Sequence, residues 1–185
     1  MLLVWRFLRE HDSTWDQGFG WRNRPGHALL LGVAIGCVYL PIGWGLQWGC
    51  AELISRLPQL HLQAKEQEAV MTLQSAATGI DWISTGLIII FLVPPAEELL
   101  FRGILYPAVK QRGYPSLALW MTALLFAGIH FNVVSFVPLT LLALVLTLLY
   151  ERTNNLLAPI AVHALFNAVN LGKLFWLQHQ AGGVP

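Results

Sequence analysis

The chain has 185 residues, of which 56% are hydrophobic and only 11% carry a formal charge. Soluble domains carry about 25% charged residues, so this composition excludes an ordinary water-exposed domain. The formal net charge of +1 gives no electrostatic basis for binding nucleic acid, and we expect no such partner. The composition instead predicts an all-α, polytopic membrane protein whose surroundings are a lipid bilayer.

The N-terminal segment, residues 1–27, mixes tryptophans and charged residues with apolar ones. It lacks the basic start, short apolar run and small-residue cleavage site of a secretory signal. Tryptophans suit the headgroup region, so we expect an interfacial segment there. From Ala28 to Ala51 no charged residue occurs. A run of this length is enough for one helix to cross a hydrocarbon core about 30 Å thick.

The rest of the chain contains one long polar stretch and several apolar segments. Residues 52–81 are polar and net acidic, whereas residues 82–108 are apolar apart from two glutamates and one arginine. Residues 113–150 carry no fixed charge and are long enough for two short helices hinged near Asn132. Residues 154–170 are apolar around one histidine. Together with the first span, these segments predict a transmembrane helical bundle of about five spans.

We expect a single membrane domain over residues 1–185, with an amphipathic or re-entrant C-terminal segment from Lys173 onward. In a bundle of five spans, the basic clusters outside the membrane fall on one side, opposite the acidic 52–81 stretch. The positive-inside rule makes that side cytoplasmic, and it places the N-terminus there as well. These basic residues are Arg6, Arg9, Arg22, Arg24, Lys110, Arg112 and Arg152.

Six polar side chains fall inside the predicted spans, where a charged group is costly unless it faces a cavity or a partner. Counted from the nearest cytoplasmic turn at 1.5 Å per residue, Glu97, His130 and Asn167 on three different helices lie roughly 20 Å from the same membrane face, and His163 lies about one turn shallower. Unrelated structural polar residues would not align in this way, so we interpret the set as one functional site with an opening toward the cytoplasmic side. The residues are Glu97, Glu98, Arg102, His130, His163 and Asn167.

The spacing within each helix refines this hypothesis. Glu98 and Arg102 are four residues apart and can pair on one helix face. Glu97 is rotated from that face by about 100° and is free to point elsewhere. His163 and Asn167 are also four residues apart, so they share a face.

A double proline precedes the two glutamates. Pro94 and Pro95 have no backbone N–H, so two carbonyls of the preceding turn lose their helical partners. This predicts a break in the span and a new helix that begins near Pro95, which is tolerated where the backbone lines a cavity. The positive end of the new helix dipole would favour ionised carboxylates just after it.

Three short motifs carry a resemblance to a known family. Residues 97–103 read EELLFRG, residues 126–130 read FAGIH, and residues 163–167 read HALFN. They match the patterns EExxxR, FxxxH and HxxxN, in that order, on three hydrophobic segments. The chain thereby resembles the CAAX protease and bacteriocin-processing (CPBP, or Abi) family, relatives of the type II prenyl-protein endopeptidases. The resemblance covers about residues 82–172, the protease-motif core, and leaves residues 1–81 unmatched.

The resemblance implies an intramembrane endopeptidase that hydrolyses a peptide bond of a membrane-tethered peptide or protein. By motif position, Glu97 and His130 would hold and activate the attacking water. His163 and Asn167 would donate hydrogen bonds to the developing oxyanion, a type of stabilisation worth about 3–4 kcal/mol per donor. The second glutamate and the arginine of the first motif would brace the site.

A zinc-dependent mechanism with the same residues stays open. Glu97, His130 and His163 would supply two histidines and one carboxylate, an established catalytic zinc set, and Glu98 would then act as the base. The chain has no HExxH motif, and Asn167 would have no obvious role beside a metal ion. We therefore prefer a reaction without metal or another cofactor.

Other functions fit the residues less well. A non-catalytic scaffold or chaperone of the same fold would be expected to lack a motif residue, and all are present. A transporter or proton relay would be expected to show repeat symmetry, and the chain has none. A serine mechanism lacks its GxSxG motif. A two-aspartate mechanism is excluded because the only aspartates, Asp12, Asp16 and Asp81, lie outside the interiors of the spans.

Overall fold

A computed structural model gives the fold of the protein, and it describes residues 14, 19–57, 71, 73 and 79–180. All regular structure within these ranges is helical, which confirms the all-α prediction. Most of the predicted interfacial segment over residues 1–27, and most of the acidic stretch, lie outside the described residues.

The described part of the chain contains eight main helical segments. In chain order they are α3 (Pro25–Ser55), α5 (Gly79–Phe91), α6 (Val93–Glu98), the π-helix η2 (Leu99–Leu105), α7 (Tyr106–Lys110), α8 (Pro115–Gly128), α9 (Val133–Thr153) and α10 (Leu157–Gln180).

Four helical stretches are long and apolar enough to cross a membrane, namely α3, the Gly79–Lys110 stretch from α5 to α7, α9 and α10. α8 is a shorter apolar helix of 14 residues, or about 21 Å, which is less than the hydrocarbon thickness. The sequence predicts about five spans, and the described residues form four helical stretches long enough to span and the shorter apolar helix α8, so the bundle of about five helices is confirmed. The protein is therefore an integral membrane protein.

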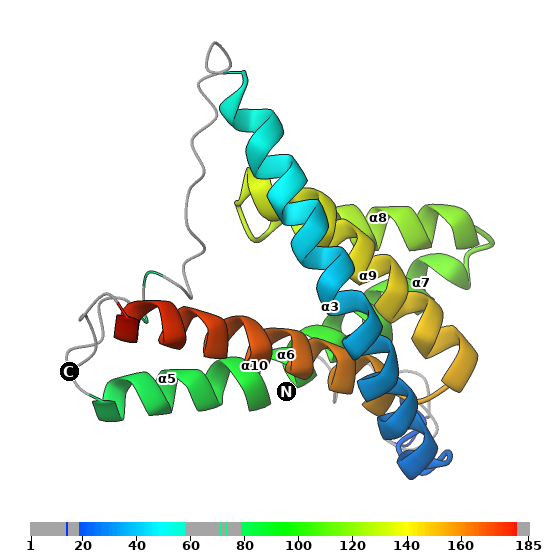
Figure 1. Cartoon of the computed structure of the whole chain (residues 1–185). Helices are drawn as coiled ribbons and strands as arrows, with labels where there is room; N and C mark the ends of the chain where they lie inside the picture. Colours follow the sequence, from blue (N-terminus) through cyan, green and yellow to red (C-terminus); the bar gives the residue numbers. More distant parts are fainter. Residues whose placement is uncertain (1–13, 15–18, 58–70, 72, 74–78, 181–185) are drawn as a thin grey trace.

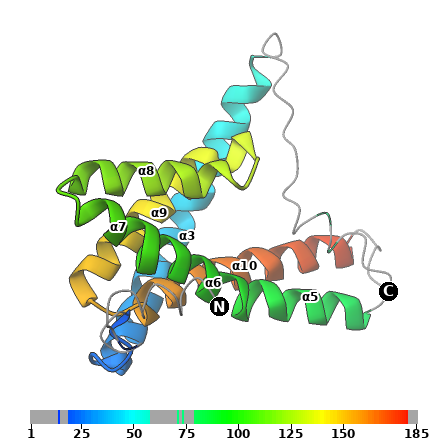
Figure 2. The same ribbon diagram turned by 180° about the vertical axis from the view of Figure 1, so that it is seen from behind.

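The helices form two groups on opposite sides of a central crossing (Figure 1). α3 packs against both α9 and α10, and α9 also packs against α8. α5 lies alongside α10, and this pair extends away from α3, while α7 and α8 lie next to α9 (Figures 1 and 2). The stretch from α6 to α7 therefore runs from one group to the other through the middle of the molecule.

Two glycines of α3 allow the close crossing with α10. A Cβ atom at Gly32 would lie 2.5 Å from the carbonyl oxygen of Ala158 and 2.8 Å from the Cβ of Ala161. A Cβ at Gly36 would lie 2.9 Å from Cδ2 of Leu165. Glycines four residues apart on one helix face let two membrane helices approach at backbone distance. This contact fixes the part of α10 that carries the HxxxN motif.

The loop between α8 and α9 confirms the predicted hinge near Asn132. The Asn132 side chain caps α9, because its Oδ1 accepts a hydrogen bond from the Ser135 N–H at 2.8 Å. Phe131, just before it, has a positive φ of 49°. The chain reverses here because the cap satisfies a backbone donor that the new helix leaves free.

The predicted break at the double proline is also present. α5 ends at Phe91, and α6 begins at Val93, two residues earlier than predicted from Pro95. Directly after α6 the helix widens into the seven-residue π-helix η2, which the sequence did not predict. π-helical turns are rare and are frequent at functional sites. The first motif therefore lies on an irregular stretch of helix.

Candidate active site

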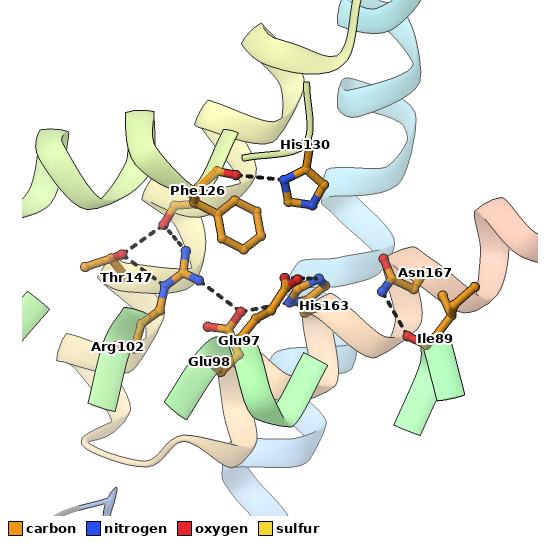
Figure 3. A network of polar contacts seen from close by, with 10 residues as sticks. Ile89, Glu97, Glu98, Arg102, Phe126, His130, Thr147, His163 and Asn167 are labelled. Atoms are coloured by element: carbon orange, nitrogen blue, oxygen red, sulfur yellow. Dashed lines mark hydrogen bonds and ion pairs between the residues drawn. The ribbon is translucent and has the colours of Figure 1, made fainter. Parts of the chain in front are cut away.

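The polar residues of the three motifs lie where α6 and η2 meet the end of α8 and the middle of α9 and α10 (Figure 3). Both glutamates lie on α6, and the arginine lies on η2. The FxxxH histidine lies in the loop after α8. The histidine and the asparagine of the HxxxN motif both lie on α10. Four of the six residues form one connected group, and the other two lie beside it.

Glu98 is the centre of the connected group and is fully buried. Its Oε1 atom accepts a hydrogen bond from Nη1 of Arg102 at 2.9 Å. The same oxygen lies 2.8 Å from Nδ1 of His163. The predicted pairing of Glu98 with Arg102 is thus confirmed, and the structure adds a histidine to it.

Each of the three nitrogens of the Arg102 guanidinium donates a hydrogen bond. Nη2 donates to the Ala143 carbonyl at 2.9 Å, and Nε donates to the Thr147 hydroxyl at 3.3 Å. The guanidinium carbon lies 4.9 Å from the centre of the Phe126 ring. A buried cation needs such partners, because an unpaired charge inside the protein is strongly destabilising. Sequence reasoning missed Thr147, although a hydroxyl in an otherwise apolar span was a usable signal.

His163 is buried between the two glutamates. Its Nδ1 faces Glu98, and its Nε2 lies 3.7 Å from Oε2 of Glu97, which is too far for a direct hydrogen bond. The Glu97 side chain is 24% exposed, but its Oε2 atom is enclosed and accepts no hydrogen bond from a described residue. The two glutamates thus reach opposite nitrogens of one imidazole ring, which agrees with the predicted rotation between them.

His130 does not bond to Glu97 within the described part of the structure. Its Nδ1 lies 2.7 Å from the Phe126 carbonyl oxygen, and its ring is 5.0 Å from the Phe126 ring. The His163 ring contacts the same phenylalanine at 5.6 Å. Phe126, the first residue of the FxxxH motif, therefore contacts both histidines, and Figure 3 shows His130 above the glutamates on the opposite side of the site from α6.

Asn167 lies one helical turn beyond His163 and bonds to a different element. Its Nδ2 donates to the Ile89 carbonyl at 3.1 Å, near the end of α5 (Figure 3). This bond uses one of the two N–H groups of the amide. Asn167 thus links α10 to the helix that precedes the double proline.

A cavity of about 340 Å³ adjoins Asn167 between α3, α5, α9 and α10. Most of its walls are apolar, among them Ile89, Leu139 and Phe166. No acidic residue occurs among the described residues that line it. Its polar lining consists of Gln47, Asn132, Ser135, Asn167, Asn170 and Lys173.

The alternative zinc mechanism requires Glu97, His130 and His163 to hold one metal ion together. Within residues 19–57 and 79–180 and the few other described positions, no three His, Cys, Asp or Glu side chains are grouped so that they could hold a metal ion.

Comparison with known proteins agrees with the three motifs. Residues 79–169 match the model of a family described as type II CAAX prenyl endopeptidase Rce1-like. A curated relative, the uncharacterized protein YpbD of Bacillus subtilis (strain 168), is 37% identical over 82 residues. That match covers 42% of this chain and 39% of the relative, so the chain matches about two fifths of the relative's length. No solved structure matches the chain. All six predicted site residues lie within residues 79–169, the region that the family model matches.

Proposed function

We propose that this chain, whose residues 79–169 match the Rce1-like family of type II CAAX prenyl endopeptidases, is an intramembrane endopeptidase. The observation that carries the proposal is the buried group of Glu98, Arg102 and His163, with the partly exposed Glu97 beside it, within membrane-spanning helices. Buried ionisable groups at membrane depth mark functional sites by default. A group with two carboxylates and an imidazole has the acid–base chemistry that hydrolysis requires.

Glu97 is the proposed base that activates water. Oε2 of Glu97 and Oε2 of Glu98 are both enclosed and accept no hydrogen bond from the described residues, but only the Glu97 side chain is partly exposed and can meet water. A water held between Glu97 and His130 would lose a proton to the carboxylate as its oxygen attacks the scissile carbonyl. When the C–N bond breaks, that proton would go to the leaving amine.

Glu98 and Arg102 are the proposed supports of the site. Donation from His163 Nδ1 to Glu98 fixes the orientation of the ring, as carboxylates do for catalytic and metal-binding histidines. Nε2 then faces the space beside Glu97. Arg102 in turn holds Glu98 in place from the other side.

His163 and Asn167 are the proposed donors to the oxyanion. For His163 this role requires a ring that carries a proton on both nitrogens, because Nδ1 already donates to Glu98. For Asn167 it requires the amide N–H that does not bond to Ile89. Hydrogen-bond donors that point at a developing negative charge stabilise the transition state more strongly in a site closed to water than in solution.

The cavity beside Asn167 is the proposed place for the substrate segment. Its apolar walls suit a membrane-tethered peptide, and its amides and hydroxyl can pair with an exposed peptide backbone. The family description makes a prenylated C-terminal peptide the first candidate to test. We also propose the predicted orientation, with the N-terminus and the basic residues on the cytoplasmic side.

The test is cleavage of a quenched fluorescent peptide with a prenylated C-terminal cysteine motif by the protein in lipid nanodiscs. We expect turnover by the wild type and its loss in Glu97→Gln, which keeps the shape of the side chain and removes its basicity. Glu52→Gln, an exposed glutamate near the end of α3, is the matched control and should leave turnover unchanged. Full activity of Glu97→Gln would remove Glu97 from the mechanism. Binding of tethered peptides without cleavage of any of them would support the scaffold function instead.

A further inference from the structure

A second cavity lies away from the candidate active site, between the start of α3 and the end of α9. Its volume is about 250 Å³. The lining residues are Asn23, Arg24, His27, Ala28, Leu31, Arg152 and Thr153. Two arginines and a histidine thus meet with no acidic residue among the described lining, although 128 positions separate Arg24 from Arg152 in the sequence.

The basic side chains of this cavity have no partner of opposite charge among the described residues. Arg24, His27 and Arg152 take part in no ion pair there, unlike Arg56, which pairs with Glu52 at 2.7 Å. Two arginine charges that line one cavity without a counter-charge repel each other, so an anion between them would stabilise the arrangement. α3 adds to this field, because it has no side-chain N-cap and no acidic residue in its first turn.

Hydrogen bonds across the cavity hold its two walls together. Asn23 Nδ2 donates to the Thr153 carbonyl at 2.9 Å, and Asn155 Nδ2 donates to the Asn23 carbonyl at 2.7 Å. Arg24 has a left-handed backbone conformation with φ of 46°, which is uncommon for a residue other than glycine. The clamp around Asn23 keeps the chain in this conformation, so a ligand would not have to order the site on binding.

We propose that this cavity binds the phosphate of an anionic phospholipid headgroup. Arginines pair with phosphate oxygens through two parallel N–H bonds, and basic pockets between membrane helices suit such headgroups. The cavity lies at the first turns of a helix that is long and apolar enough to cross a membrane, and the end of such a helix is where headgroup phosphates are expected. Directly beyond it, α3 exposes the apolar side chains of Leu29, Leu30 and Val33, along which acyl chains would lie. This site does not depend on the proposed peptidase activity.

The test is thermal unfolding of the full chain in an uncharged detergent with added phosphatidylglycerol, phosphatidylcholine or inorganic phosphate. At a tenfold excess over its dissociation constant, phosphatidylglycerol should raise the Tm by about 3–6 °C. Phosphatidylcholine and inorganic phosphate at the same concentration should leave the Tm unchanged. The double variant Arg24→Gln/Arg152→Gln should lose the shift. Arg112→Gln, which removes an exposed arginine outside the cavity, should keep it.

Two further variants test the role of charge and cover the case in which the double glutamine variant does not fold. Arg24→Lys/Arg152→Lys retains both charges and should keep part of the shift. If the double glutamine variant does not fold, native mass spectrometry of Arg152→Gln should show less bound phosphatidylglycerol than the wild type. A wild-type shift in the glutamine variant, or wild-type lipid occupancy in Arg152→Gln, overturns the proposal. An equal shift with inorganic phosphate would also overturn it and assign the cavity to a free anion.

Discussion

Nδ1 of His163 lies 2.8 Å from Oε1 of Glu98, although 65 residues separate them in the sequence. The same oxygen accepts the Arg102 hydrogen bond at 2.9 Å, so one buried carboxylate joins η2 to α10. Glu98 therefore connects the first motif to the third. This arrangement leaves Glu97 as the glutamate that faces the unpaired side of the imidazole.

Arg102→Ala should act mainly through stability. The substitution leaves Glu98 buried without its cation, and breaking a buried ion pair in this way costs about 3–5 kcal/mol. We expect a marked fall in the Tm in detergent, measured beside activity. Arg56→Ala, which removes an exposed ion pair, is the control and should change the Tm little. A variant as stable as the wild type but inactive would give Arg102 a direct part in catalysis or substrate binding.

Glu97→Ala and His130→Ala should each abolish hydrolysis and leave the protein folded. Neither side chain is fully buried, and neither takes part in the Glu98–Arg102 pair, so their loss leaves that buried ion pair intact. Turnover and Tm should be measured on the same purified samples. Near-wild-type turnover in either variant would disprove the water-activating pair.

Asn167→Ala should lower the rate by about 10²–10³-fold and change substrate binding little, as loss of an oxyanion donor does. The readout is the separate change in kcat and KM. A higher KM with an unchanged kcat would instead make Asn167 a substrate-binding residue of the adjoining cavity. A large fall in the Tm would show that its bond to Ile89 matters mainly for packing.

Chelation should leave most of the activity intact. The proposed reaction uses glutamate and histidine directly, so 1,10-phenanthroline should not stop turnover. The measurement is activity before and after chelation, together with the metal content of the purified protein. One stoichiometric zinc, lost with activity on chelation and restored with it on re-addition, would replace the glutamate mechanism with the zinc mechanism.

Gly32→Val should destabilise the protein by about 1–3 kcal/mol, because overpacking forces the two helices apart. Its Cβ would meet the Ala158 backbone at 2.5 Å, so α10 and His163 would have to move. We expect a lower Tm and lower turnover. Gly45→Val on the same helix is the matched control, since a Cβ there meets nothing within 4 Å. Equal effects of the two substitutions would mean that helix propensity, rather than the crossing, causes the loss.

The sequence by itself determined the features that depend on local chemistry. Apolar runs of sufficient length predicted the helices, because a span must satisfy its own backbone within the bilayer. The double proline predicted the break before Glu97, because two backbone donors are missing there. The spacing of four residues predicted the Glu98–Arg102 pair, because such residues are neighbours on one helix face. The three motifs identified six candidate residues, and all six lie within the region that the family model matches.

The tertiary structure decided which distant groups meet. His163 takes Glu98 as its partner, Thr147 supports Arg102, and Asn167 bonds to Ile89, all through contacts between different helices. Such contacts depend on how closely the helices approach and at what rotation. In this protein the approach of α3 to α10 follows from the missing side chains of Gly32 and Gly36. No local pattern specifies which helix fills that space, because packing energy is shared among residues that are far apart in the sequence.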